Sequence, residues 1–150
     1  MKISNSVISQ MFDGPIDIVG DIHGELDALT NLMAHLGYDA DGCHRDHRHM
    51  IFVGDLCDRG PDSPGVVALV SRLVASGRAQ CVMGNHEFNV LRKSRKAANG
   101  WWFAVDHDQA KGRHLDSRRA DDDERQAIYD FFSTLPLALE REDLRVIHAA

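Results

Sequence analysis

The sequence predicts an α/β fold with helices packed on a parallel sheet. Short apolar runs typical of buried strands alternate with longer segments whose apolar residues recur every three or four positions, the spacing of a helix. The first three strand-like runs also end alike, in a glycine followed directly by a polar residue. The 150 residues amount to 16.7 kDa, which is the length of one ordinary domain, so we expect residues 1–150 to form a single domain.

The first unit of this pattern is a strand followed by a helix. Residues 16–19 form a short apolar run that leads into Gly20. Residues 26–36 then carry apolar side chains at helical spacing, and Gly37 is expected to end the helix. Residues 1–14 show no such pattern, and we expect them to be loose.

Two further strand and helix units follow. A second strand at 50–53 leads to a helix that we expect to begin with Ser63 as its N-cap and Pro64 as its first residue. A third strand at 81–83 leads to a helix over 88–97. The repeated order of strand, helix and strand favours parallel pairing, because parallel neighbours need a long crossover between them.

The last third of the chain is less regular. Residues 99–120 show no clear period, and we expect a long loop or short irregular helices there. Residues 121–132 begin with acidic side chains that suit the positive end of a helix dipole. Two strands, at 137–139 and 144–147, are expected to flank a charged turn.

Composition and charge exclude several classes of protein. The net charge of −6 argues against a general DNA-binding protein, and no apolar run approaches the roughly 20 residues of a membrane-spanning helix. Three cysteines without paired spacing, and no signal-peptide pattern, predict a reduced cytoplasmic protein. Residues 92–119 are an exception to the acidic balance, with eight Lys and Arg against three Asp. This segment either meets an anionic ligand or is solvated surface.

Residues that can bind metal ions follow each of the first three strands. They are Asp21 and His23 after the first strand, Asp55 and Asp58 after the second, and Asn85 and His86 after the third. Because the carboxyl ends of parallel strands meet at one edge of a sheet, we expect these side chains to converge. Such ligands suit manganese, iron or zinc. Two ions sharing Asp55 would make a two-metal hydrolytic centre.

Four motifs stand in order along the chain. They are GDIHG at 20–24, GDLCDRG at 54–60, GNHE at 84–87 and VIHA at 146–149. Together they resemble those of the calcineurin-like metallophosphoesterases, in the phosphoprotein-phosphatase branch. The resemblance implies a metallophosphoesterase-type α/β sandwich, of which this chain carries the N-terminal β-α-β-α-β part and the start of the second half.

The resemblance also implies two divalent ions, with manganese expected first and iron or zinc as alternatives. The implied ligands are Asp21 and His23 for the first ion, Asn85 and His148 for the second, and Asp55 as the bridge between them. The implied reaction is the hydrolysis of phosphate esters by a hydroxide that bridges the ions. Bacterial proteins similar to this one act on phosphorylated proteins, dinucleoside polyphosphates or polynucleotide ends, and we expect a phosphorylated protein or a nucleotide as the substrate.

Three further roles follow from the resemblance. His86 would be the general acid, oriented by Asp58. Arg59 would bind the phosphoryl oxygens through its forked donors, with Asn85 and His86 also contacting the phosphate. No nucleophile from the protein is needed, so we expect Cys57 to be a packing residue.

Family members continue beyond the VIHA segment with strands that carry a further ligating histidine. We therefore expect these 150 residues to be a domain truncated at its C-terminus, with the second ion one ligand short. Val146 and Ile147 would then lie near an open edge. The alternative hypothesis is a catalytically degenerate metal- or phosphate-binding module.

Two other features have more than one reading. Trp101, Trp102 and Phe103 fit either a core or subunit contact or a surface that stacks a nucleobase. His44, His47 and His49 could bind a transition metal, but their charged loop favours solvation.

Overall fold

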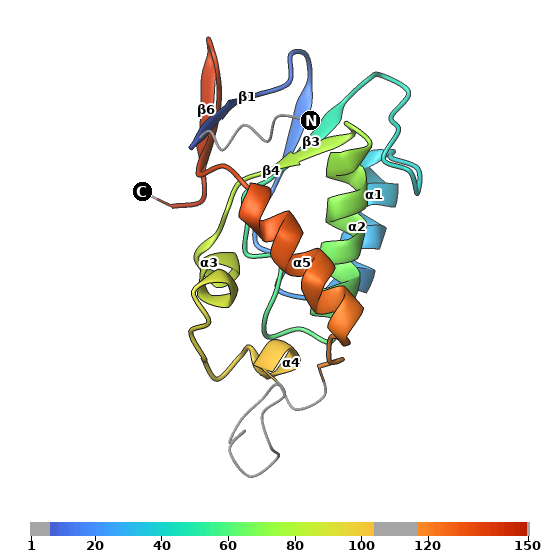
Figure 1. Ribbon diagram of the computed structural model, residues 1–150. Helices are drawn as coiled ribbons and strands as arrows, with labels where there is room; N and C mark the ends of the chain where they lie inside the picture. Colours follow the sequence, from blue (N-terminus) through green and yellow to red (C-terminus); the bar gives the residue numbers. More distant parts are fainter. Residues whose placement is uncertain (1–6, 104–116, 150) are drawn as a thin grey trace.

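The computed structural model describes residues 7–103 and 117–149 and contains two three-stranded sheets (Figure 1). The first sheet holds parallel strands β2 (Ile16–Val19), β3 (His49–Phe52) and β4 (Ala79–Cys81), in that order. The second sheet has the order β1 (Ile8–Gln10), β5 (Ala138–Arg141), β6 (Leu144–Ile147). In it, β1 runs parallel and β6 antiparallel to β5. The expected mixed α/β architecture is confirmed.

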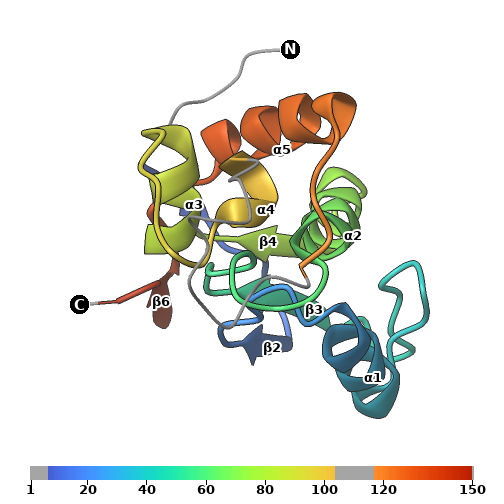
Figure 2. The same cartoon turned by 90° about the horizontal axis from the view of Figure 1, so that it is seen from below.

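Helices lie along one side of the first sheet and below its strands (Figure 1). They are α1 (Leu26–Leu36), α2 (Ser63–Ala75), α3 (Asn85–Leu91), α4 (Gly100–Phe103) and α5 (Asp122–Thr134). The two views agree that α2 lies between α1 and α5 (Figures 1 and 2). Among the described residues, no helix has both the length and the apolar character that crossing a membrane requires.

The central strand β3 has apolar side chains on both of its faces. Met50 and Phe52 pack into the larger core cluster with the helices. Ile51, whose side chain points the other way, packs into a smaller cluster between the sheets, with Leu139 and Val146. Strand β3 is therefore covered on both faces, as parallel strands usually are.

Helix ends follow the expected rules, with two corrections. Gly37 ends α1 in the left-handed conformation, at a φ of 92°. The N-cap of α2 is Asp62 rather than Ser63, because Asp62 Oδ1 accepts from the backbone N–H of Gly65 at 2.8 Å. Ser63 is buried, and its Oγ instead accepts from the backbone N–H of Asp58 at 2.9 Å.

The third helix is also displaced from its expected range of 88–97. Helix α3 begins at Asn85, directly after Gly84, and ends at Leu91. It starts early because the side chain of Glu87 accepts from the backbone N–H of Gly84 at 2.9 Å. The first turn of α3 therefore contains the polar end of the GNHE motif.

Strand β1 lies in the segment that we expected to be loose. Ile8–Gln10 pairs with β5, and Met11 is buried between the sheets. The side chain of Gln80 joins this segment to β4, accepting from Phe12 N at 2.9 Å and donating to the carbonyl oxygen of Gln10 at 2.7 Å. Because these contacts join segments that are distant in the sequence, no local pattern of apolar residues predicts β1.

The expectations for the C-terminal part are met unevenly. Strand β6 lies at an edge of its sheet, and Ile147 is 42% exposed. Val146 is nevertheless buried, because it faces the first sheet. In the irregular segment 99–120, Gly100–Phe103 forms the short helix α4. Residues 104–116, which include Lys111 and Arg113 of the basic segment, lie outside the described residues.

Candidate metal centre

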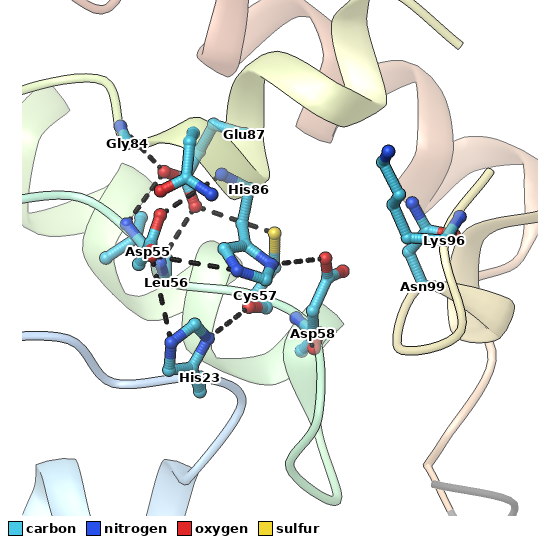
Figure 3. Close-up of polar contacts among 12 residues, drawn as sticks. His23, Asp55, Leu56, Cys57, Asp58, Gly84, His86, Glu87, Lys96 and Asn99 are labelled. Atoms are coloured by element: carbon cyan, nitrogen blue, oxygen red, sulfur yellow. Dashed lines mark hydrogen bonds and ion pairs between the residues drawn. The ribbon is translucent and has the colours of Figure 1, made fainter. Parts of the chain in front are cut away.

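The candidate centre lies where the strands of the first sheet end, and Asp55 is in its middle. The side chain of Asp55 is 6% exposed. Its Oδ2 atom lies 3.8 Å from Nε2 of His23 and 3.8 Å from Nε2 of His86, and both rings point toward it (Figure 3). Nε2 of His148, which follows β6, lies 3.5 Å away. Three imidazoles from different strand ends thus face one carboxylate oxygen.

Hydrogen bonds at the far ring nitrogens determine how two of these histidines are presented. Nδ1 of His23 lies 2.9 Å from the carbonyl oxygen of Cys57, and Nδ1 of His148 lies 2.8 Å from that of Val53. Because a carbonyl oxygen can only accept, each Nδ1 carries the proton and donates it. Nε2 of His23 is then an acceptor, whereas Nε2 of His148 also lies 3.0 Å from an amide oxygen, Oδ1 of Asn85. An acceptor nitrogen that faces a carboxylate suits a cation between them, and histidine metal ligands are commonly oriented by such bonds.

Two overlapping sets of side chains could therefore hold metal ions. They are His23, Asp55 and His86 in one set and Asp21, Asp55 and His148 in the other, with the ligand atoms of each set within 4.8 Å of one another. Asp55 belongs to both, as a bridging ligand would. From the sequence, we instead expected Asp21 and His23 to bind the same ion, and we expected His86 to be the general acid and not a ligand. The sets overlap because these atoms surround one carboxylate, and Asp21 Oδ2 also lies 3.8 Å from His23 Nε2.

Asn85 and Arg59 lie at the rim of this cluster. Asn85 is exposed at the start of α3, and its Oδ1 atom is 3.0 Å from Nε2 of His148. The two residues expected to share the second ion therefore do come together. Arg59 is exposed next to Asp58, and its role at a phosphate stays a prediction.

Asp58 and His86 form a directly bonded pair. Nδ1 of His86 lies 2.6 Å from Oδ2 of Asp58, whose side chain is fully buried (Figure 3). The bond holds the His86 ring so that Nε2 faces Asp55. A histidine held in this way by a carboxylate can carry a second proton on Nε2, which is what a general acid needs.

The buried carboxylate of Glu87 joins two segments that carry candidate ligands. Its Oε2 accepts from the backbone N–H groups of Asp55 and Gly84, at 2.8 and 2.9 Å, and its Oε1 accepts from that of Leu56 at 2.8 Å (Figure 3). Burial raises the pKa of the Glu87 carboxyl, and these backbone donors oppose the rise. The thiol of Cys57 also contacts Oε1, and burial raises its pKa well above the usual value, as suits a packing residue.

Sequence reasoning missed two residues that support the centre. Glu87 had a local signal. It stands three positions after Gly84, the N-cap of α3, and an acidic side chain at that position can accept from backbone N–H groups at the start of a helix. Trp101 had none. It is 3% exposed, which excludes a stacking surface, and its indole Nε1 donates to Oδ1 of Asp58 at 2.6 Å.

The backbone around the centre is strained. Left-handed φ values between 48° and 72° occur at His23, Asp55, Asp58 and Arg59. Such values are uncommon outside glycine and tend to gather at functional sites. Gly60 permits the tight crossing of two of these loops, because a methyl group there would overlap the carbonyl oxygen of His23.

Comparison with known proteins decides the family. The family model for calcineurin-like phosphoesterases matches residues 14–148, nearly the whole chain. The chain belongs to the calcineurin-like phosphoesterases. The resemblance seen in the four motifs is therefore confirmed, and the two sheets with helices on one face are this family's architecture in this chain.

Relatives of this calcineurin-like phosphoesterase include bacterial nucleotide hydrolases. The Bis(5'-nucleosyl)-tetraphosphatase PrpE (asymmetrical) of Oceanobacillus iheyensis is 33% identical over 137 residues, covering 89% of this chain and 54% of the relative. The enzyme of the same name from Halalkalibacterium halodurans is 48% identical over 73 residues, covering 47% of this chain and 30% of the relative. The chain thus spans about half the length of the first of these relatives.

A solved structure is similar over almost the entire chain. It bears the name of a diadenosine tetraphosphatase, and it superimposes with a TM-score of 0.64 at 27% identity. The match covers 95% of this chain and 54% of that one. The chain thus spans about half the length of that solved structure.

Proposed function

We propose that this calcineurin-like phosphoesterase hydrolyses phosphate esters and anhydrides at a dinuclear metal centre built around Asp55. The observation that carries the proposal is the convergence of three histidine Nε2 atoms on one oxygen of Asp55, within 3.5 to 3.8 Å. The nitrogen of His23 is an acceptor, because Nδ1 of the same ring donates to the carbonyl oxygen of Cys57. An acceptor nitrogen that faces a carboxylate is a poor arrangement without a cation and a good one with it.

In this proposal each side chain has one task. Asp21 and His23 would hold one ion, Asn85 and His148 would hold the other, and Asp55 would serve both sites. Two divalent ions bound there, for which we favour manganese, would supply a nucleophile at neutral pH and would offset the charge of the phosphoryl group. His86, protonated on Nε2 and braced by Asp58, gives its proton to the leaving oxygen. Arg59 binds the phosphoryl oxygens with its forked donors.

We propose a dinucleoside polyphosphate as the first substrate to test. The support comes from the names of the relatives, two of which are bis(5'-nucleosyl)-tetraphosphatases. A phosphorylated protein is the second candidate, because the four motifs belong to the phosphoprotein-phosphatase branch. Both substrates present a phosphoryl group to the same centre, and they differ in the group that leaves.

The test combines metal analysis with a panel of substrates. The longest natural polypeptide that contains these 150 residues is loaded with manganese, and metal content and turnover are measured on diadenosine tetraphosphate, a phosphopeptide and nitrophenyl phosphate. We expect two ions per chain and turnover of at least one substrate. Bound metal without turnover of any substrate would support a binding module and contradict the proposal.

A further inference from the structure

The carboxylate of Asp58 is bonded at both of its oxygens, and only one of the bonds leads into the metal centre. Oδ2 meets Nδ1 of His86 at 2.6 Å, and Oδ1 accepts from the indole Nε1 of Trp101 at 2.6 Å. Asp58 is 0% and Trp101 is 3% exposed. Trp101 is 43 residues away in the sequence and belongs to none of the four motifs, so its contact with Asp58 arises from the tertiary fold.

Trp101 is itself held firmly in place. It lies in the short helix α4, and its carbonyl oxygen accepts from the backbone N–H of Ala120 at 3.0 Å. The preceding loop is shaped by Asn99, which is fully buried, accepts from Lys96 N at 2.8 Å and donates to the carbonyl oxygen of Ser94 at 3.0 Å. Figure 3 shows Lys96 and Asn99 on this loop, across from Asp58.

The same loop also meets the backbone beside Asp58. The carbonyl oxygen of Ala98 accepts from the backbone N–H of Arg59 at 3.3 Å. Asp58 and Arg59 both have left-handed backbones, at a φ of 72°. A strained pair of residues persists only where its surroundings hold it, and here the segment from Ser94 to Trp101 supplies both a backbone and a side-chain contact.

We propose that Trp101 is a positioning residue for the Asp58–His86 pair, acting through the second oxygen of Asp58. A carboxylate bonded at one oxygen can turn about its Cβ–Cγ bond, whereas bonds at both oxygens fix its plane. The indole N–H also satisfies a buried anionic oxygen that would otherwise be costly. With Asp58 fixed, Nδ1–H of His86 keeps one partner and Nε2 stays aimed at Asp55. The inference rests on the proposed function, in which His86 protonates the leaving group.

Trp101→Phe tests this role, with Trp102→Phe as the matched control. Phenylalanine keeps an aromatic ring at position 101 and removes only the indole donor and part of the volume. Trp102 is the neighbouring residue, half-buried, and its ring contacts that of Trp101 at a centroid distance of 5.6 Å. Arg125 donates to the backbone oxygen of Trp102, a bond that the substitution leaves unchanged.

The kinetic readout is the dependence on the leaving group. Because general-acid help matters most for a poor leaving group, we expect Trp101→Phe to lower kcat on an alkyl phosphate by about tenfold, part of the roughly 10²–10⁴-fold that such catalysis supplies. Turnover of nitrophenyl phosphate should fall much less, and metal content should stay the same. Trp102→Phe should leave the ratio of the two rates unchanged. Equal losses on both substrates, or the same change of ratio in Trp102→Phe, would overturn the proposal.

A double variant tests whether Trp101 acts through Asp58. In an Asp58→Asn background, Trp101→Phe should add little further loss, since the group it positions is already altered. Fully additive losses would show an independent structural effect and overturn the inference.

A magnetic-resonance measurement on metal-free protein separates this inference from the proposed function and does not depend on the folding of Trp101→Phe. The Trp101 indole proton should resonate far downfield in the wild type and move upfield in Asp58→Asn, and the His86 ring nitrogens should change with it. An unmoved indole resonance would overturn the inference whatever the turnover. The expected shifts without turnover of any phosphoester would instead leave the contact in place and contradict the proposed function.

Discussion

An aspartate lies at each end of the first sheet, and the two have opposite kinds of neighbours. Near the start of β2, Asp17 accepts from Tyr38 Oη at 2.7 Å and from Nε and Nη2 of Arg48 at 2.8 and 2.6 Å. At the other end, Asp55 faces three imidazole nitrogens. The chain supplies its own cation at one end and presents acceptors suited to an external cation at the other.

The pKa of the Asp17 carboxyl reflects the hydrogen bonds that the protein itself supplies to Asp17. The hydrogen bond from Arg48 lowers the pKa of the Asp17 carboxyl, and burial together with the bond to Asp17 raises the pKa of the Tyr38 hydroxyl. We infer that the Asp17 end serves stability and the Asp55 end serves function. Matched substitutions at the two ends separate these roles.

The largest effect is expected from Asp55→Asn. The substitution keeps the shape of the side chain but removes the charge that both candidate ions share. We expect metal affinity to fall by more than about 100-fold, beyond the 10–100-fold typical for residues that only support a ligand, with loss of turnover. The measurement is metal content after dialysis, with Asp17→Asn as the control that keeps its metal. If Asp55→Asn still retained two ions, the assignment of Asp55 as the bridging ligand would be wrong.

His86→Asn should come next. Asparagine keeps a donor for Asp58 but cannot act as a general acid, so turnover of an alkyl phosphate should fall by about 10²–10⁴-fold, and that of nitrophenyl phosphate by less. Metal content should stay at the wild-type level. Should this variant lose an ion, His86 would instead be a ligand in the set that it forms with His23 and Asp55.

Glu87→Gln tests whether the Glu87 carboxylate stabilises the segments that carry Asp55 and Asn85. The change turns one acceptor oxygen into a donor that faces a backbone N–H, in a site where the side chain is fully buried. Burying such a mismatch costs about 1–3 kcal/mol of unfolding free energy, which denaturant titration measures. The control is Glu140→Gln, because Glu140 pairs with Arg145 on the exposed face of the second sheet. Similar losses in the two variants would refute the support assigned to Glu87.

The smallest effect is expected from Asp17→Asn, and it depends on pH. Because the folded pKa of Asp17 is lowered, its contribution to stability is complete above the ordinary value of 3.8 and is lost as pH falls through the lower folded value. The variant should therefore melt a few degrees below the wild type at neutral pH, and the gap should close in acid. A gap of constant size down to pH 2 would contradict the assignment.

Much of this protein is determined by local sequence. Short apolar runs located β2 and β3, and the helical spacing of apolar side chains located α1 and α5, because such patterns repeat over a few residues. The strand-end rule then brought Asp21, Asp55 and Asn85 to one edge. These inferences need only the pattern of neighbouring residues and the geometry of a parallel sheet.

Other features were decided by tertiary structure alone. His148 meets the carbonyl oxygen of Val53 across 95 residues, and Trp101 meets Asp58 across 43. Strand β1 exists because β5 pairs with it, and Gln80 bonds a backbone segment 70 residues away. No pattern within a short window encodes these contacts, since each requires two distant segments to be packed first. The sequence by itself therefore determined which side chains gather at the sheet edge, and the packing decided which atom of each one faces Asp55.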